Sequence, residues 1–159
     1  MVTDINRTPE LLSRLEQFAV LEEVIGIFGD EAKVPHPGTE LTMVELAAIH
    51  EYGTRNGHVP ARPWISVGTD RARSLVGTVI QAGIQQVLEG GTTAGQVLDR
   101  AGLAIKGSIQ KYASSPSSPP PPLALSTIKA KGSANPLVDT GRMIQAVQND
   151  HRPREGERK

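Results

Sequence analysis

Residues 63–91, PWISVGTDRARSLVGTVIQAGIQQVLEGG, decide the fold of this chain. Apolar side chains recur in this stretch at intervals of three and four residues, the spacing of one face of an α-helix. The pattern predicts a long amphipathic helix from Pro63 to about Glu89, which the following Gly-Gly pair ends. The predicted apolar stripe consists of Ile65, Ala72, Leu75, Val76, Val79, Ile80, Ile84, Val87 and Leu88.

Three glycines interrupt the predicted helix, namely Gly68, Gly77 and Gly83. Each of them costs the helix up to about 1 kcal/mol relative to alanine. A residue without a side chain lets a neighbouring backbone come close. We therefore expect another helix or another subunit to approach this helix at its glycines.

The residues before this helix predict two shorter helices and a strand. Thr8 is expected to cap a helix that begins at Pro9 and extends to about residue 18. Residues 24–28 are β-branched and aromatic around a glycine, which predicts a strand buried on both faces. Thr42 with Glu45 forms a capping box for a second helix, and Gly53 ends that helix. The predictions also include a short strand at 32–34 and loops at 34–38 and 55–61.

The residues after Gly91 predict a second long helix and several short elements. Thr93 with Gln96 forms another capping box, and apolar residues at helical spacing follow as far as Tyr112. Residues 113–122 hold four consecutive prolines, which favour an extended polyproline arm. The remaining predictions are a helix at 125–131 ended by Gly132, a helical turn at 136–140 closed by Gly141, and a strand at 143–148.

Together these elements predict an α+β fold. A small mixed or antiparallel sheet is expected to pack with two longer helices, and the Pro-rich arm at 113–122 extends from them. We expect a single domain over residues 1–150, since 159 residues is the size of one ordinary domain. Residues 151–159 are polar and charged and are predicted to form a C-terminal tail.

Composition excludes several classes of protein. The chain has no cysteine, so disulfides, thiolate metal sites and cysteine nucleophiles are absent. Its 17 basic and 17 acidic side chains balance, which argues against a dedicated nucleic-acid-binding protein. No apolar run approaches the length of a membrane span, and no secretory signal is recognisable, so we expect no membrane partner and synthesis in a cytoplasm.

The charges are distributed unevenly along the chain. Residues 1–51 carry three basic and ten acidic side chains, a net charge of 3 − 10 = −7, whereas residues 52–159 carry 14 basic and 7 acidic ones, a net charge of +7. This asymmetry suits head-to-tail association, in which the acidic part of one copy meets the basic part of the next. It equally suits two faces of one monomer that attract each other.

The residues that could carry chemistry do not form a recognisable catalytic, cofactor or metal site. His50-Glu51 lacks the second histidine that a zinc-protease helix places four residues later, and His36, His50 and His58 are scattered over loops and a helix end. The glycine-bearing loop 53–58 lacks the Lys-Ser/Thr pair of a phosphate loop. Asp139-Thr140-Gly141 has the residues of an aspartic-protease motif, but helices surround it. We therefore expect no enzyme activity.

Two segments taken together resemble the minor tail or neck proteins of tailed bacteriophages. The first runs from Ala47 to Thr54 as AAIHEYGT and continues at 59–65 as VPARPWI. It is similar to that family's "His-Glu-aromatic-Gly-Thr" and "Ile-Pro-Ala-Arg-Pro-aromatic-aliphatic" signature. The second segment follows about 70 residues later and includes a proline pair, a Thr-Ile, a Lys-Gly and the run PLVDTGRM at 136–143. Order and spacing agree over roughly residues 24–148. The motif residues are His50, Glu51, Gly53, Thr54, Pro60, Arg62, Pro63, Trp64, Pro121, Pro122, Asp139, Thr140, Gly141 and Arg142.

The motif residues suggest specific packing roles. Pro60 and Pro63 stiffen the backbone around Arg62, whose guanidinium could pair with the carboxylate of Glu51 or of Asp139. Trp64 is expected to anchor either the core or a neighbouring subunit. Asp139 is expected to cap the turn around Gly141, and the Pro-rich arm could lie over an adjacent subunit as an ordered strap.

The resemblance implies a structural, non-enzymatic virion protein. It implies a ring of six or twelve copies between the capsid portal and the tail tube, which completes the tail or joins head to tail. The implied partners are other copies of the chain and other phage neck, connector and tail-tube proteins, and DNA can pass through the lumen of the ring. Alternatives are a cytoplasmic tail-assembly chaperone and a small hydrolase or protease that uses Asp139 or His50.

Overall fold

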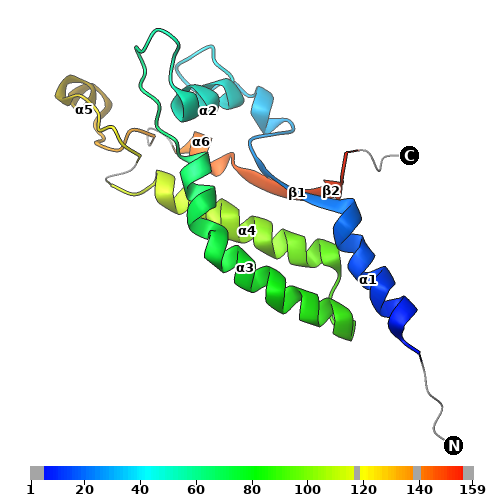
Figure 1. Cartoon of the computed structure of the whole chain (residues 1–159). Coiled ribbons are helices and arrows are strands. Elements are labelled where there is room, and N and C mark those ends of the chain that lie inside the picture. The colour runs from blue at the N-terminus through cyan, green and yellow to red at the C-terminus, as the bar shows by residue number, and fades with distance from the viewer. Residues whose placement is uncertain (1–5, 117–118, 138–140, 156–159) are drawn as a thin grey trace, which may run out of the picture. The chain divides into compact units, whose positions relative to one another are not determined.

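The computed structural model describes residues 6–116, 119–137 and 141–155, and the chain divides into two compact units. The first unit comprises Met1–Val24, Ser74–Ala104 and Asn149–Lys159, and the second comprises Ile25–Arg73 and Ile105–Gln148. The elements in chain order (Figure 1) are α1 Thr8–Val20, β1 Leu21–Gly26, the short 3-10 helix η1 Glu31–Lys33, α2 Met43–Tyr52, α3 Ile65–Glu89, α4 Ala94–Ala113, α5 Leu125–Lys131, α6 Arg142–Gln145 and β2 Gln148–Pro153.

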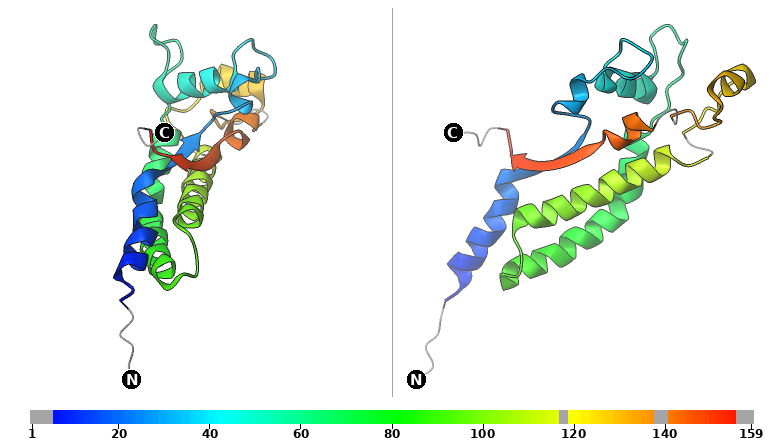
Figure 2. Two further views of the ribbon diagram at one scale, coloured as in Figure 1. Left: turned by 90° about the vertical axis from the view of Figure 1, so that its right-hand side faces the viewer. Right: turned by 180° about the vertical axis from the view of Figure 1, so that it is seen from behind.

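In the first unit, the facing parts of α3 and α4 run side by side (Figure 2), and α1 meets the end of α3. Gly83 of α3 lies so close to Val97 of α4 that a Cβ atom on the glycine would collide with the valine side chain. Arg14 of α1 donates to the carbonyl oxygens of Val87 and Leu88, at 3.3 and 2.8 Å, near the C-terminus of α3. A guanidinium there adds a donor for carbonyls at the end of the helix, of which that of Val87 also accepts from the amide of Gly90.

Helix α1 begins differently from the prediction. Thr8 is its first residue rather than its N-cap, and the capping position is Arg7, whose side chain makes no capping hydrogen bond. Instead the amide of Thr8 donates to Oδ1 of Asn6 at 3.1 Å. The predicted helix is confirmed, and its start moves by one residue because Asn6 supplies the acceptor.

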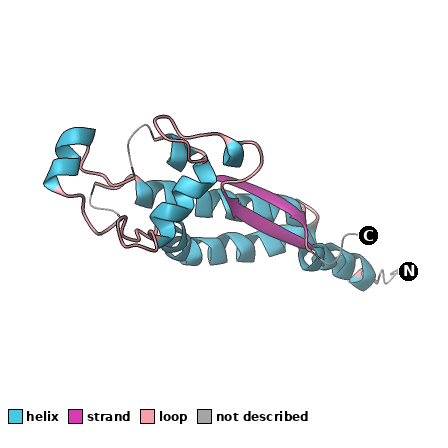
Figure 3. Ribbon diagram, turned by 90° about the horizontal axis from the view of Figure 1, so that it is seen from above, coloured by secondary structure: helices cyan, strands magenta, loops and turns pink. Residues whose placement is uncertain are grey.

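The sheet has two antiparallel strands, β1 and β2 (Figure 3). This confirms an α+β fold with a small antiparallel sheet. The strand predicted at 24–28 lies instead at 21–26, and every residue of it is half-buried rather than buried on both faces. The reason is that β1 pairs its acids with β2: Glu22 accepts from Arg152 at 2.9 Å, and Glu23 accepts from Asn149 at 3.0 Å.

Three other sequence predictions are wrong. The strand predicted at 32–34 overlaps the 3-10 helix η1, and the first half of the strand predicted at 143–148 belongs to α6. The polar stretch expected to begin a C-terminal tail at His151 forms half of β2. The stretch was predicted as a tail because it is polar. In the folded chain, the polar side chains of β2 have partners on β1 and α4, which the sequence alone does not reveal.

The core of the second unit surrounds Trp64, Met43 and Ile109, whose side chains are fully buried. Gly68 of α3 allows a close approach to α4, since a Cβ atom there would lie 2.5 Å from Cα of Ile109. The guanidinium of Arg71 stacks 4.2 Å from the ring centre of Tyr112, a cation–π contact between the same two helices. Gly68 and Gly83 therefore confirm the expected close approach to another helix.

Local signals in the second unit and at the start of α4 are also confirmed. Thr42 and Glu45 form both hydrogen bonds of a capping box at α2. Thr93 and Gln96 exchange the equivalent pair at α4, at 3.2 and 3.3 Å. Gly132 ends α5 in the left-handed conformation, with φ of 72°.

The C-terminal part of the second unit departs from the prediction. Gly141, with φ of 75°, precedes α6 instead of closing a helical turn. The predicted turn at 136–140 lies partly outside the described residues. An extended arm at 113–122 is not confirmed, because α4 continues to Ala113 and Pro119 is fully buried.

Among the residues that the structure describes, no helix combines the length and the apolar character needed to cross a membrane.

Candidate interaction site

The first motif segment forms the corner between α2 and α3. Glu51, near the end of α2, points its carboxylate at the start of α3, where it accepts from the amides of Trp64, Ile65 and Ser66 at 2.8, 2.9 and 3.2 Å. The hydroxyl of Ser66 also donates to it, at 2.5 Å. These amides have no partner within α3, and a negative charge there interacts favourably with the helix dipole. One helix thereby supplies the N-terminal cap of the next.

The surroundings of Glu51 act on its pKa in opposite directions. Burial of the carboxyl group raises the pKa, while the hydrogen bonds from Ser66, Ile65 and Trp64 lower it. The hydrogen bonds prevail, so the pKa lies below its ordinary value of 4.5. Glu51 is therefore held as a carboxylate, although the residue is only 6% exposed.

Gly53 and Thr54 close the loop between the two helices. Gly53 has a φ of 76°, and a Cβ atom on it would lie 2.8 Å from the amide nitrogen of Ala61. The Thr54 amide donates to the carbonyl of Val59 at 2.9 Å, and the Val59 amide donates to the Thr54 hydroxyl at 2.8 Å. The glycine and the threonine of the motif thus stabilise the conformation of the loop.

Arg62 connects the first motif segment with the second. Its amide donates to the carbonyl of His50 at 2.7 Å, and Nε of its guanidinium donates to the carbonyl of Pro121 at 2.9 Å. Burial, which leaves the residue 5% exposed, lowers its pKa. The predicted pair with Glu51 is wrong, because the amides of α3 occupy that carboxylate. The alternative partner Asp139 lies outside the described residues, as does Thr140.

Trp64 belongs to the core. Its side chain is fully buried, and its indole nitrogen donates to the carbonyl of Ala47 in α2 at 3.5 Å. Of the two roles that the sequence left open for this tryptophan, the structure supports core anchoring.

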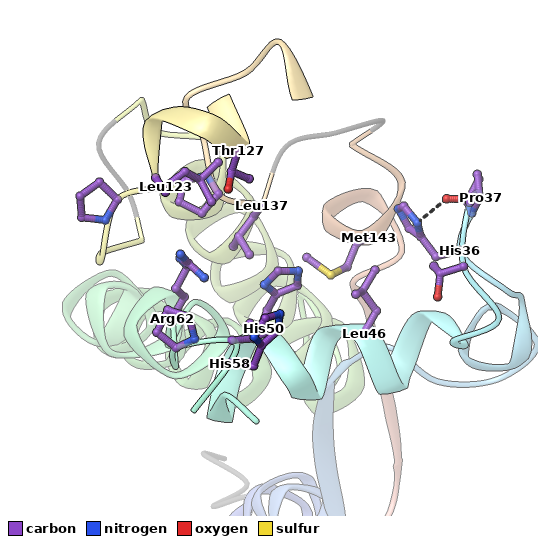
Figure 4. Close-up of a pocket in the computed structure, with 17 residues that line it drawn as sticks. His36, Pro37, Leu46, His50, His58, Arg62, Leu123, Thr127, Leu137 and Met143 are labelled. Atoms are coloured by element: carbon purple, nitrogen blue, oxygen red, sulfur yellow. Dashed lines mark hydrogen bonds between the residues drawn. The ribbon is translucent and has the colours of Figure 1, made fainter. Parts of the chain in front are cut away.

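A pocket of about 720 Å³ lies between the two motif segments. Figure 4 shows Arg62, His50 and Leu46 pointing toward side chains of the later segment, among them Leu137 and Met143. Pro60 and Pro122 also line the pocket. The structure therefore brings together motif residues that are far apart in the sequence, within one unit.

His36, His50 and His58 all line this pocket, but they are not arranged as a metal site. His36 is held by a 2.9 Å contact between its Nδ1 and the carbonyl of Pro37, shown dashed in Figure 4. Within the described residues, the side chains that could hold a metal ion are those of Glu23, Asp99 and His151 in the first unit. Their ligand atoms lie within 4.8 Å of one another.

This acid–histidine cluster joins β1, α4 and β2 and was missed by the sequence prediction. Nδ1 of His151 lies 2.7 Å from a carboxylate oxygen of Asp99, and this hydrogen bond raises the pKa of His151. Burial raises the pKa of Glu23, and the charge of Asp99 adds to the effect although Asn149 opposes it. The residues come from three elements, so no local spacing could have indicated the cluster.

The His151–Asp99 pair predicts a pH dependence of stability. The folded-state pKa of His151 is raised, so the pair stabilises the fold below pH 6.5 and loses its effect as the pH rises through the folded-state pKa. The raised pKa of Glu23 also lowers the stability of the fold as the pH rises above 4.5. From about pH 6 to about pH 8, we expect wild-type Tm to fall relative to that of His151→Gln. The corresponding change in the free energy of unfolding should be below about 1 kcal/mol, because the side chains of His151 and Asp99 are both more than a third exposed. A constant difference in Tm across this range would contradict the role given to His151.

The other predicted motif residues lie at the surface. Pro60 and Pro63 are exposed, and Pro121 contributes its carbonyl to Arg62. Arg142, the first residue of α6, lines a shallow hollow of about 260 Å³ together with Glu31 and Gln145. The hollow is separate from the larger pocket.

Comparison with known proteins gives no match: no protein-family model, no curated protein and no solved structure is significantly similar to this chain.

Proposed function

We propose that this chain is a structural subunit of the neck or tail of a tailed-phage virion. In this proposal it forms a ring, of six or twelve copies, that completes the tail or joins head to tail. The observation that carries the proposal is the contact between the two motif segments. Arg62 binds Pro121, 59 residues away, and both segments line one pocket. Segments that resemble one family and meet in space are consistent with a shared surface of that family.

Exposed apolar side chains support binding to other protein subunits. Tyr52 and Leu125 in the second unit are 81% and 78% exposed, and Leu75 and Leu103 in the first unit are 55% and 58% exposed. The sequence pattern places Leu75 in the apolar stripe of α3, but the structure leaves its side chain exposed. Side chains of this size are often covered when a protein assembles. The proposed partners are further copies of the chain and other neck, connector and tail-tube proteins, with DNA passing through the ring without specific binding.

The roles of the motif residues favour a structural over an enzymatic function. Glu51 caps a helix, Gly53 and Thr54 close a loop, and Trp64 fills the core. Each of these residues serves packing, hydrogen bonding or backbone conformation, as expected of a subunit that acts through its surface.

The proposal is tested first by its location. Mass spectrometry of purified virions should detect the chain among the structural proteins, in a multiple of the portal or tail stoichiometry. Its presence in infected cytoplasm combined with its absence from virions would contradict the proposal and favour a tail-assembly chaperone.

Self-association of the purified chain provides a second test. The charge asymmetry between residues 1–51 and 52–159 predicts oligomers that weaken as salt screens the attraction. Sedimentation velocity in about 0.05 M and about 0.5 M NaCl should show a shift toward smaller species at the higher concentration. A monomer at all protein concentrations in both buffers would argue against a ring.

A further inference from the structure

The guanidinium of Arg62 is buried but incompletely bonded. The residue is 5% exposed, and Nε alone of its three nitrogens has a hydrogen-bond partner among the described residues. Nη1 and Nη2 have no such partner, yet neither is fully enclosed by the protein. Each therefore keeps some accessible surface. Arg62 lines the pocket between the motif segments, and the missing bonds can be made by a molecule inside it.

A buried guanidinium without an anion is unfavourable. It remains charged in proteins, and taking a charge out of water is costly unless a partner of opposite charge and further hydrogen bonds compensate. Across the described residues, no carboxylate forms an ion pair with Arg62, since Glu51 is directed to α3. An anion bound in the pocket would supply the negative charge that the described part of the chain does not place beside Arg62.

The walls of the pocket indicate which anion fits. Apolar side chains line the same pocket as the guanidinium, namely those of Leu46, Val59, Leu123, Leu137 and Met143, together with three histidines. The planar guanidinium presents paired N–H groups that match the two oxygens of a carboxylate. About 720 Å³ is ample for a small organic group and lies within the range of ligand pockets.

We propose that this pocket binds a carboxylate carried on an apolar stem, with Arg62 as its bidentate partner. Such a group occurs at the end of an acidic side chain and in free organic acids. The site does not depend on the proposed virion role, and the binding test below can fail while incorporation into virions stands.

Titration of the full-length chain with hexanoate, a carboxylate on an apolar stem, tests the proposal. Isothermal calorimetry should show binding to the wild type and an affinity at least about tenfold lower for Arg62→Met, which keeps an unbranched apolar side chain. Arg62→Lys should also bind more weakly, because an ammonium group cannot form the paired bonds. Inorganic phosphate should bind less tightly than hexanoate. Equal hexanoate binding by Arg62→Met, no binding by the wild type, or tighter binding of phosphate would overturn the proposal.

Thermal unfolding separates loss of the site from loss of the fold. Because Arg62→Met removes a buried charge, we expect its Tm to stay within a few degrees of wild type. A drop of more than about 10 °C would mean that the Arg62 side chain is already engaged in holding the fold, and would overturn the proposal. Asp139→Asn is the matched control and should bind hexanoate as the wild type does. A clear gain in its affinity would mean that the chain's own Asp139 competes for the site, and would overturn the proposal.

A competition experiment distinguishes the two sources of the carboxylate. If an acidic side chain of another copy enters the pocket, saturating hexanoate should weaken self-association of the wild type but not of Arg62→Met. If self-association is unaffected while hexanoate still binds through Arg62, the ligand is a carboxylate from a different molecule. Both results support the carboxylate site, and they assign its natural ligand to different sources.

Discussion

Replacing Glu51 with alanine is expected to lower the free energy of unfolding by about 3–5 kcal/mol. Loss of a helix N-cap costs about 0.5–2 kcal/mol, and each buried donor left without a partner costs about 1–3 kcal/mol. The carboxylate receives bonds from the amides of Trp64, Ile65 and Ser66. Chemical denaturation at neutral pH measures the loss, and a change below about 1 kcal/mol would show that water replaces the carboxylate.

Glu51→Gln is the control that separates shape from charge. Its amide keeps one acceptor oxygen but introduces a donor that faces the amides of α3, so we expect an intermediate loss of stability. The wild-type pKa of Glu51 is lowered, so this carboxylate stabilises the fold above pH 4.5, and the stabilisation is lost as the pH falls through the folded-state pKa. The stability difference between wild type and Glu51→Gln should therefore shrink below pH 4.5. A difference that stays constant on acidification would contradict the assigned charge.

Alanine at Gly68 and alanine at Gly77 are expected to have opposite effects, although both glycines lie in α3. At Gly68 a Cβ atom would lie 2.5 Å from Cα of Ile109, which is backbone and cannot move aside without shifting α4. We expect Gly68→Ala to lower the free energy of unfolding by about 1–3 kcal/mol, as overpacking commonly does.

Gly77 provides the matched control, because a Cβ atom there meets nothing within 4 Å. Gly77→Ala should raise the free energy of unfolding by up to about 1 kcal/mol, the difference in helix propensity between the two residues. Urea titrations of both variants measure the contrast. Similar stabilisation by the two substitutions would mean that α3 and α4 do not approach each other closely at Gly68.

The sequence by itself determined the features that depend on neighbouring residues. The capping boxes at Thr42 and Thr93, the end of α5 at Gly132 and the extent of α3 were all predicted correctly. In each of them the interacting groups are three or four residues apart. Such contacts form in any fold that keeps the helix, so local pattern suffices to predict them.

Only the tertiary structure decided the features that join distant parts of the chain. The second half of β2, from His151, is polar and was predicted as part of a tail, yet β2 pairs with β1 through residues about 130 positions earlier. Glu51 caps α3 across 13 residues instead of pairing with Arg62, and Arg62 reaches the carbonyl of Pro121. A carboxylate or a guanidinium has several partners that the sequence allows equally. Which one it meets depends on the path of the backbone between them, and that path is fixed by packing of the whole unit.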